Sequence, residues 1–167
     1  MGTKSTPDLV LPKAQETAIF RTVEHVLARD PLLSSHVNTF LAMRGEDQDF
    51  FEPAVSLCPY LEIAPWPTES GWLTEGQHES PLTVRIMCAV KGTNSDNLMN
   101  FWAAVRAALF PQVQPQRGLV IAQFVAIGVG VSRPTIRLNA YGATKDKEGL
   151  RMCIADGTVT FWTAINT

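Results

Sequence analysis

The stretch "VRIMCAVKGTNSDNLMNFWAAVRAALFP", from Val84 to Pro111, decides the fold class because its apolar pattern changes from a strand period to a helix period. Apolar side chains alternate with other residues from Pro81 to Lys91, which predicts a strand. From Ser95 onward the apolar side chains recur on one helical face: Leu98, Phe101, Trp102, Val105 and Leu109. Ser95 is expected to cap this helix, because a serine hydroxyl accepts hydrogen bonds from the first free amides. We therefore predict that the helix packs Trp102 against a sheet that contains Val84.

The turn between this strand and helix resembles a phosphate-binding loop only in outline. The segment "KGTNSDN", residues 91–97, has a single glycine and lacks the Gly-Lys-Ser/Thr ending of a P-loop. The segment "GVGVSR", residues 128–133, has Arg133 where a dinucleotide-binding fingerprint needs its third glycine, and no helical pattern follows. We interpret both segments as structural and expect no cofactor.

The first half of the chain predicts one helix and two further strands. Apolar residues at helical spacing indicate an amphipathic helix from Lys13 to Arg29, which Asp30-Pro31 should end. A strand is expected from His36 to Gly45, and a short strand follows in "SLCPYLEIAPW". Pro59 interrupts that strand, which favours an edge position or a bulge. Residues 67–80 read as a surface loop, and residues 1–12 as a flexible N-terminal arm.

The second half of the chain is rich in strand signals. Residues 118–131 are apolar on both faces, residues 135–142 alternate, and residues 142–149 form a charged turn. In the last segment, residues 150–165, Asp156-Gly157 can form a hairpin turn or a bulge within one long strand, and we favour the bulge. The expected order is α-β-β-β-α-β-β-β within a single domain, residues 13–167.

Composition narrows the classes of function. Charged residues make up 18% of the 167 residues, below the usual value of about 25%, and the formal net charge is −2. A low fraction of charged residues is expected if partner proteins cover part of the surface. The alternative is that the exposed surface is simply less charged. The chain therefore lacks the excess of positive charge that is typical of general nucleic-acid binding. No run of apolar residues is long enough to predict a membrane span, and the three cysteines are expected to be buried and reduced in an intracellular protein: Cys58, Cys88 and Cys153.

No catalytic or metal-binding signature stands out. His25, His36 and His78 are scattered singly, and no nucleophile motif is present, so we expect neither a metal site nor an enzyme. Four acidic residues form either a solvated loop or a functional acidic rim: Glu46, Asp47, Asp49 and Glu52. Four basic residues form either a DNA-facing patch or, as we favour, a solvated strand edge: Arg133, Arg137, Lys145 and Lys147.

Aromatic residues in loop-like segments are the main indication of association. The set comprises Phe50, Phe51, Trp66 and Trp72. Aromatic side chains are enriched at protein interfaces, so these four are interface candidates. The alternative is that they fold back onto the core of their own domain.

The order of these segments resembles a known family. "CPYLEI" follows the leading helix, a long strand leads into "KGTNSDNLMNFWAAVRAALFP", and a glycine-rich apolar strand precedes the closing strand "GTVTFWTAI". The arrangement resembles the tail terminator and tail completion proteins of long-tailed bacteriophages, with related neck proteins, over roughly residues 13–167. The resemblance implies an α+β fold in which two amphipathic helices pack on a mostly antiparallel sheet. It supplies no catalytic residues.

The resemblance also implies a function and partners. Protomers of this family form a homo-oligomeric ring, commonly a hexamer, which ends polymerisation of the tail tube protein and receives the head connector, stopper or portal-associated protein. DNA only passes through the lumen, where the four acidic residues are candidates to line the wall. The protein would be made in the host cytoplasm and located in the virion, away from any membrane. The alternatives are a head-completion, stopper or tail-tube protein, or a small enzyme whose site is assembled in space.

Overall fold

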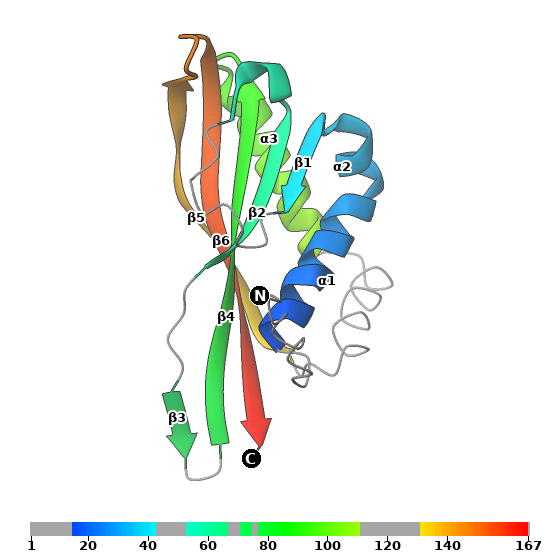
Figure 1. The fold of residues 1–167 in the computed structure, drawn as a ribbon, viewed down its shortest axis with the longest axis vertical. Coiled ribbons are helices and arrows are strands. Elements are labelled where there is room, and N and C mark those ends of the chain that lie inside the picture. The colour runs from blue at the N-terminus through cyan, green and yellow to red at the C-terminus, as the bar shows by residue number, and fades with distance from the viewer. Residues whose placement is uncertain (1–14, 43–52, 67–70, 75–76, 111–130, 167) are drawn as a thin grey trace, which may run out of the picture.

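The computed structural model of the chain describes residues 15–42, 53–66, 71–74, 77–110 and 131–166. In these ranges the chain forms helices and a mostly antiparallel sheet, which confirms the predicted α+β class (Figure 1). The elements are α1 (Gln15–Arg29), α2 (Pro31–His36), β1 (Thr39–Ala42), a 3-10 helix (Val55–Leu57), β2 (Tyr60–Trp66), β3 (Gly71–Thr74), β4 (Gln77–Lys91), α3 (Ser95–Leu109), β5 (Val131–Lys145) and β6 (Arg151–Asn166).

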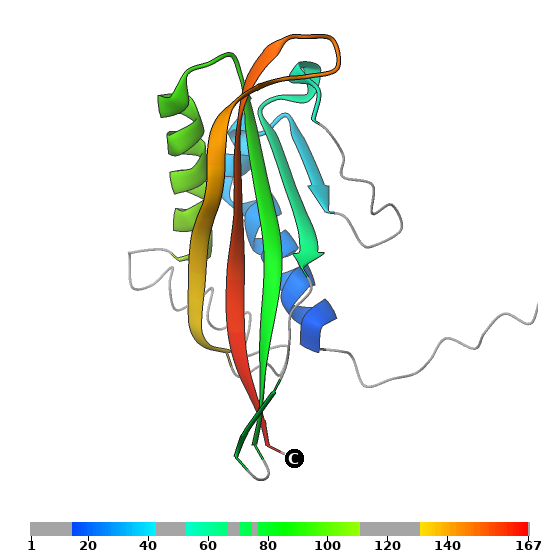
Figure 2. The same ribbon diagram turned by 90° about the vertical axis from the view of Figure 1, so that its left-hand side faces the viewer.

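The sheet has the strand order β1-β2-β4-β6-β5, and β3 pairs with β4 beyond the end of β2. Only the β1–β2 pair is parallel among the described strands. The β4–β6 ladder runs without a register shift from Gln77 opposite Asn166 to Lys91 opposite Met152. At about 3.4 Å per residue, this ladder is about 50 Å long. It is the axis around which the other elements are arranged (Figure 2).

The α-helices cover one face of the sheet and bury the main core. The apolar stripe of α1 is buried there, as are Val84 and Ile86 of β4. The stripe of α3 behaves as its spacing predicts, since Leu98, Trp102, Val105 and Leu109 are buried and Phe101 is half-buried. Trp102 lies against Gly157 of β6, where a Cβ atom would clash with the Trp102 ring and with the Arg137 carbonyl oxygen.

A three-stranded projection extends the sheet beyond the helices. The last β2–β4 pair joins Trp66 to Thr83, so the first residues of β4 lie beyond β2. We call β3, residues 77–81 of β4 and residues 162–166 of β6 the β-arm. Figure 1 shows the β-arm reaching past the ends of α1 and α3. Residues 67–80 were expected to be a surface loop, but 71–74 and 77–80 are strand.

Two boundaries in the first half differ from the sequence prediction. Asp30-Pro31 ends α1 as expected, but the same two residues also start α2. The Asp30 carboxylate caps α2 by accepting a hydrogen bond from the Leu33 amide at 3.0 Å, and proline is well suited to the first turn of a helix. Pro59 does not interrupt a strand, since it precedes β2 after a cis peptide bond. The predicted edge position is also wrong, because strand β2 lies between β1 and β4 in the sheet.

Two details of the second half also differ. Asn94, not Ser95, caps α3, because its side-chain oxygen accepts from the Asp96 amide at 3.0 Å. Asp156-Gly157 lies in one long strand as favoured, but the register shift falls on β5 between Leu138 and Ala140, while β6 keeps its register with β4. The expected N-terminal arm, and the apolar segment 118–131 apart from Val131, lie outside the described residues.

Candidate functional site

The face of the sheet opposite the α-helices, here called the far face, carries the polar side chains of the long strands. Alternation along each strand sends one set of side chains to the core and the other to the far face. The register then aligns the far-face residues in rows across the strands. One row is Trp66, Thr83, Thr160 and Thr135, the next is Ala64, Arg85, Thr158 and Arg137, and the third is Glu62, Met87, Asp156 and Ala140.

One end of the far face is covered by the 3-10 helix. Tyr60, Met87 and Ala89 are buried there beneath partly buried neighbours that include Leu57 and Cys58. The Asp146 carboxylate, in the turn between β5 and β6, accepts from the Val55 amide at 3.1 Å and holds this cover in place. The far face is thus closed at one end and open toward the β-arm.

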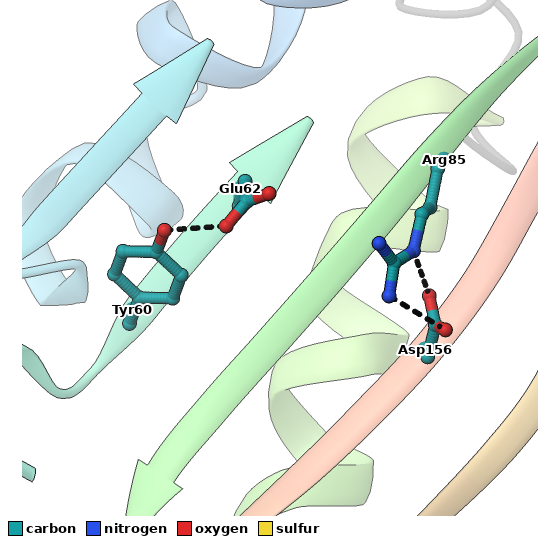
Figure 3. Close-up of polar contacts among 4 residues, drawn as sticks. All are labelled: Tyr60, Glu62, Arg85 and Asp156. Carbon is teal, nitrogen blue, oxygen red and sulfur yellow. Dashed lines mark hydrogen bonds and ion pairs between the residues drawn. The ribbon is translucent and has the colours of Figure 1, made fainter. Parts of the chain in front are cut away.

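A buried acid–phenol pair lies at the boundary of the covered part (Figure 3). Tyr60 is 0% exposed and Glu62 is 3% exposed. The Tyr60 hydroxyl donates to Glu62 Oε2 at 2.5 Å. Burial raises the pKa of the Glu62 carboxyl, while the bond from Tyr60 and the charge of Arg85 act in the opposite direction. Burial, together with the bond to Glu62, also raises the pKa of Tyr60.

A bidentate ion pair joins the two central strands beside that acid. Arg85 Nε lies 2.9 Å from Asp156 Oδ1, and Arg85 Nη2 lies 3.0 Å from Asp156 Oδ2 (Figure 3). Two parallel bonds to one carboxylate fix the plane of the guanidinium. The Arg85 Cζ atom is also 5.8 Å from the centroid of the Trp66 ring, within range of a cation–π interaction. Arg85 therefore bridges β4 to both β2 and β6.

The open part of the far face forms a shallow polar depression, here called the hollow. Its volume is about 450 Å³, and it is lined by Trp66, Thr83, Thr135, Arg137, Asn139, Thr158 and Thr160. Thr83 and Thr160 are hydrogen-bonded across the strands, with 2.9 Å between their Oγ1 atoms. Trp66 is 45% exposed, and Arg137 is exposed and forms no ion pair with any residue that the structure describes. The hollow thus offers an aromatic side chain, several hydroxyls and a cation.

A second depression lies on the helical side and is mainly apolar. It has a volume of about 390 Å³ and lies between α2, α3 and the end of β4. Leu32, Val37 and Phe101 supply apolar walls, with Lys91 and Asn100 at its lining. Besides Lys91, the ionisable side chain of His36 belongs to its lining.

The polar groups of the described residues can also be compared with the ligand sets that hold metal ions. Over these ranges, no three His, Cys, Asp or Glu side chains are placed to hold a metal ion. Tyr60 and Glu62 are too deeply buried to meet a substrate, and Asp156 already engages Arg85. The network therefore stabilises the sheet. None of the helices in the described ranges combines the length and apolar character that a bilayer crossing requires.

The structure places only some of the residues singled out from the sequence. Trp66 lies at the rim of the hollow, and Trp72 lies in β3, opposite His78 of β4. Phe50, Phe51, Glu46, Asp47, Asp49 and Glu52 lie outside the described residues. Arg137 and Lys145 are both exposed and stand eight positions apart on β5, and Lys147 is exposed in the turn that follows. Arg133 lies in β5, but its side chain is outside the described ones.

Sequence reasoning missed the polar residues that converge on the far face. Glu62, Arg85 and Asp156 each interrupt an apolar segment at a position where alternation assigns them to the face opposite the core. That signal was present in the sequence. Their convergence depends on the register between β2, β4 and β6, which no single strand encodes.

Comparisons with known proteins add no relative. No protein-family model matches the chain, and no curated protein is similar to it in sequence.

Proposed function

We propose that this protein is a structural subunit of a phage virion, forming a homo-oligomeric ring at the head-proximal end of the tail tube. There it stops tube polymerisation and joins the tail to the head connector, while DNA passes through the lumen. The observation that carries the proposal is the β-arm. Figure 1 shows these three strands extending past the α-helices, and a projecting part of a sheet suits a surface that becomes buried on assembly.

Two further features support a role in association. The α+β fold, with helices on one face of a mostly antiparallel sheet, is the one that the family resemblance implies. The outer edge of β5 pairs with no other strand that the structure describes, and an unpaired strand edge is a place where another chain can add a strand.

The proposal is tested first by the assembly state. Native mass spectrometry and negative-stain microscopy of the purified chain should show closed rings. Rings that stack into long tubes would instead point to a tail-tube protein. A chain that stays monomeric at every concentration and is absent from virions would refute the neck-protein role.

Trp72→Glu tests whether the β-arm makes the contact. An unpaired charge in a desolvated interface costs several kcal/mol, so the variant should keep a normal circular dichroism spectrum and lose the ring. Virions made with it should have overlong tails or unjoined heads. Leu32→Glu is the matched control, because Leu32 is an exposed apolar residue of α2, away from the β-arm. Rings that form equally well with Trp72→Glu would remove the β-arm from the interface.

A further inference from the structure

The depression between α2, α3 and the end of β4, here called the interhelical pocket, is lined by one face of each helix. On α2, Leu32 and His36 are four positions apart. On α3, Asn97, Phe101 and Ala104 follow one another at intervals of four and three positions. Residues at these intervals lie on the same side of a helix. Regular secondary structure therefore builds both walls of the pocket.

The interior of the interhelical pocket is apolar. Leu33 and Val90 belong to the main core, and Phe101 and Ala104 pack half-buried against it. Leu32 remains 56% exposed, so part of this apolar surface is uncovered. The volume of about 390 Å³ lies within the range of roughly 300–1,000 Å³ that is usual for pockets that bind small ligands. The interior therefore suits the apolar body of a small molecule.

The polar side chains that line the interhelical pocket are able to donate hydrogen bonds, and two of them are basic. Lys91 and His36 are the ionisable residues of the described lining, and Asn97 and Asn100 add amide groups. All four residues are exposed. No aspartate or glutamate belongs to the described lining. A ligand that complements these donors therefore carries a negatively charged acceptor.

The described residues leave the basic groups of the pocket without an acid partner. Lys91 forms no ion pair with any residue in the described ranges. Asp30, at the start of α2, accepts from the Leu33 amide. His36 Nδ1 lies 3.0 Å from the Leu32 carbonyl oxygen, which can only accept, so Nδ1 holds a proton. A second proton on Nε2 makes the imidazole a cation that can donate to an anion.

We propose that the interhelical pocket binds a small molecule with an apolar body and a single carboxylate group. The apolar body lies between α2 and α3 against Phe101, and the carboxylate meets Lys91 and His36. This ligand site goes beyond the proposed function, because it requires neither the ring nor the β-arm.

Two matched probes separate the charge of the ligand from its apolar body. 4-Phenylbutyrate carries a carboxylate, and 4-phenylbutyramide replaces it with a neutral amide of nearly the same shape. Saturation-transfer NMR titrations that observe the ligand measure both dissociation constants with the full chain, and a large assembly does not prevent the measurement. The acid should bind saturably, and its dissociation constant should be about threefold or more below that of the amide, on the scale expected of an exposed ion pair.

Substitutions in the lining locate the binding site. Lys91→Gln should lower the preference for the acid, and adding His36→Gln should remove it, while the affinity for the amide stays as in the wild type. Ala104→Leu fills part of the interior and should reduce binding of both probes below detection. Arg106→Gln is the matched control, because Arg106 is an exposed cation of α3 outside the lining, and it should leave the preference unchanged. Circular dichroism and thermal melts check that each variant is folded.

The outcomes separate this inference from the proposed function. A wild-type chain that binds neither probe, or binds both equally, overturns the ligand site. A preference for the acid that survives both charge substitutions, or binding that Ala104→Leu leaves unchanged, overturns it as well. If Ala104→Leu dissolves the rings of a wild type that ignores both probes, the pocket is a contact between subunits, which overturns the ligand site and supports the ring. Binding as expected by a chain that never forms rings supports the ligand site and overturns only the proposed function.

Discussion

Gly157 is the position where the structure makes its sharpest prediction about stability. A methyl group at this residue would meet the Trp102 ring from one side and the Arg137 carbonyl oxygen from the other. The Trp102 ring can shift only by disturbing the core around α3, and the carbonyl belongs to the paired backbone of β5. Because overpacking a core costs about 1–3 kcal/mol, Gly157→Ala should lower the free energy of unfolding by about 3 kcal/mol, at the upper end of that range.

The same contact predicts how Gly157 and Trp102 depend on each other. Trp102→Ala should cost about 3–5 kcal/mol, because a large buried side chain leaves a cavity that collapses only partly. In that background the added methyl group of Gly157→Ala enters vacated space. The double variant should therefore be more stable than the sum of the two single effects predicts, by about 1 kcal/mol or more.

Urea denaturation followed by far-ultraviolet circular dichroism measures these differences, at one protein concentration for all variants so that any association affects them equally. Gly142→Ala is the matched control, because Gly142 lies in the neighbouring strand β5 and an added methyl group there would meet nothing within 4 Å. If Gly157→Ala proves as stable as Gly142→Ala, or if the double variant is strictly additive, Trp102 does not pack on Gly157.

Two further predictions concern ionisable groups. Burial raises the pKa of Glu62 above its ordinary 4.5, so the stability linked to this carboxyl is complete below pH 4.5 and is lost as the pH rises through the raised pKa. Glu62→Gln should flatten that loss in urea denaturation between about pH 4 and about pH 8, and a variant that loses stability as steeply as the wild type contradicts the burial of an ionising group. The three cysteines are free, and burial raises the pKa of the Cys88 thiol, so a thiol reagent should modify half-buried Cys58 first and reach Cys88 and Cys153 only on unfolding. An internal disulfide found by mass analysis of the non-reduced protein would contradict this.

Much of the fold could be predicted because the spacing of apolar residues along the chain distinguishes strands from helices. The strand leading to Lys91 and the helix that presents Trp102 follow directly from spacings of two and of three to four residues. The helix α2 was missed because Asp30-Pro31 fits a helix end as well as a helix start, and the sequence alone does not choose between them. Asn94 was passed over for Ser95 because both residues are good caps and they stand next to each other.

The β-arm and the far-face network could not be predicted for a different reason. The segment around Trp72 is rich in glycine and polar residues, which is typical of a loop, and it becomes strand because β4 and β6 supply a template beside it. Arg85 and Asp156 are 71 positions apart, and their pairing follows from the alignment of β4 with β6. Long-range register is a property of the whole sheet, and a one-residue slip would place these side chains on the opposite face.

The unbroken β4–β6 ladder also has a mechanical consequence. Antiparallel hydrogen bonds run perpendicular to their strands, so a pull along the strand axis loads many of them together in shear. A force applied to the tip of the β-arm would therefore be transmitted as tension into the centre of the sheet, without a hinge between tip and body. The projection behaves as a stiff lever, and whatever holds its end also fixes the orientation of the whole subunit.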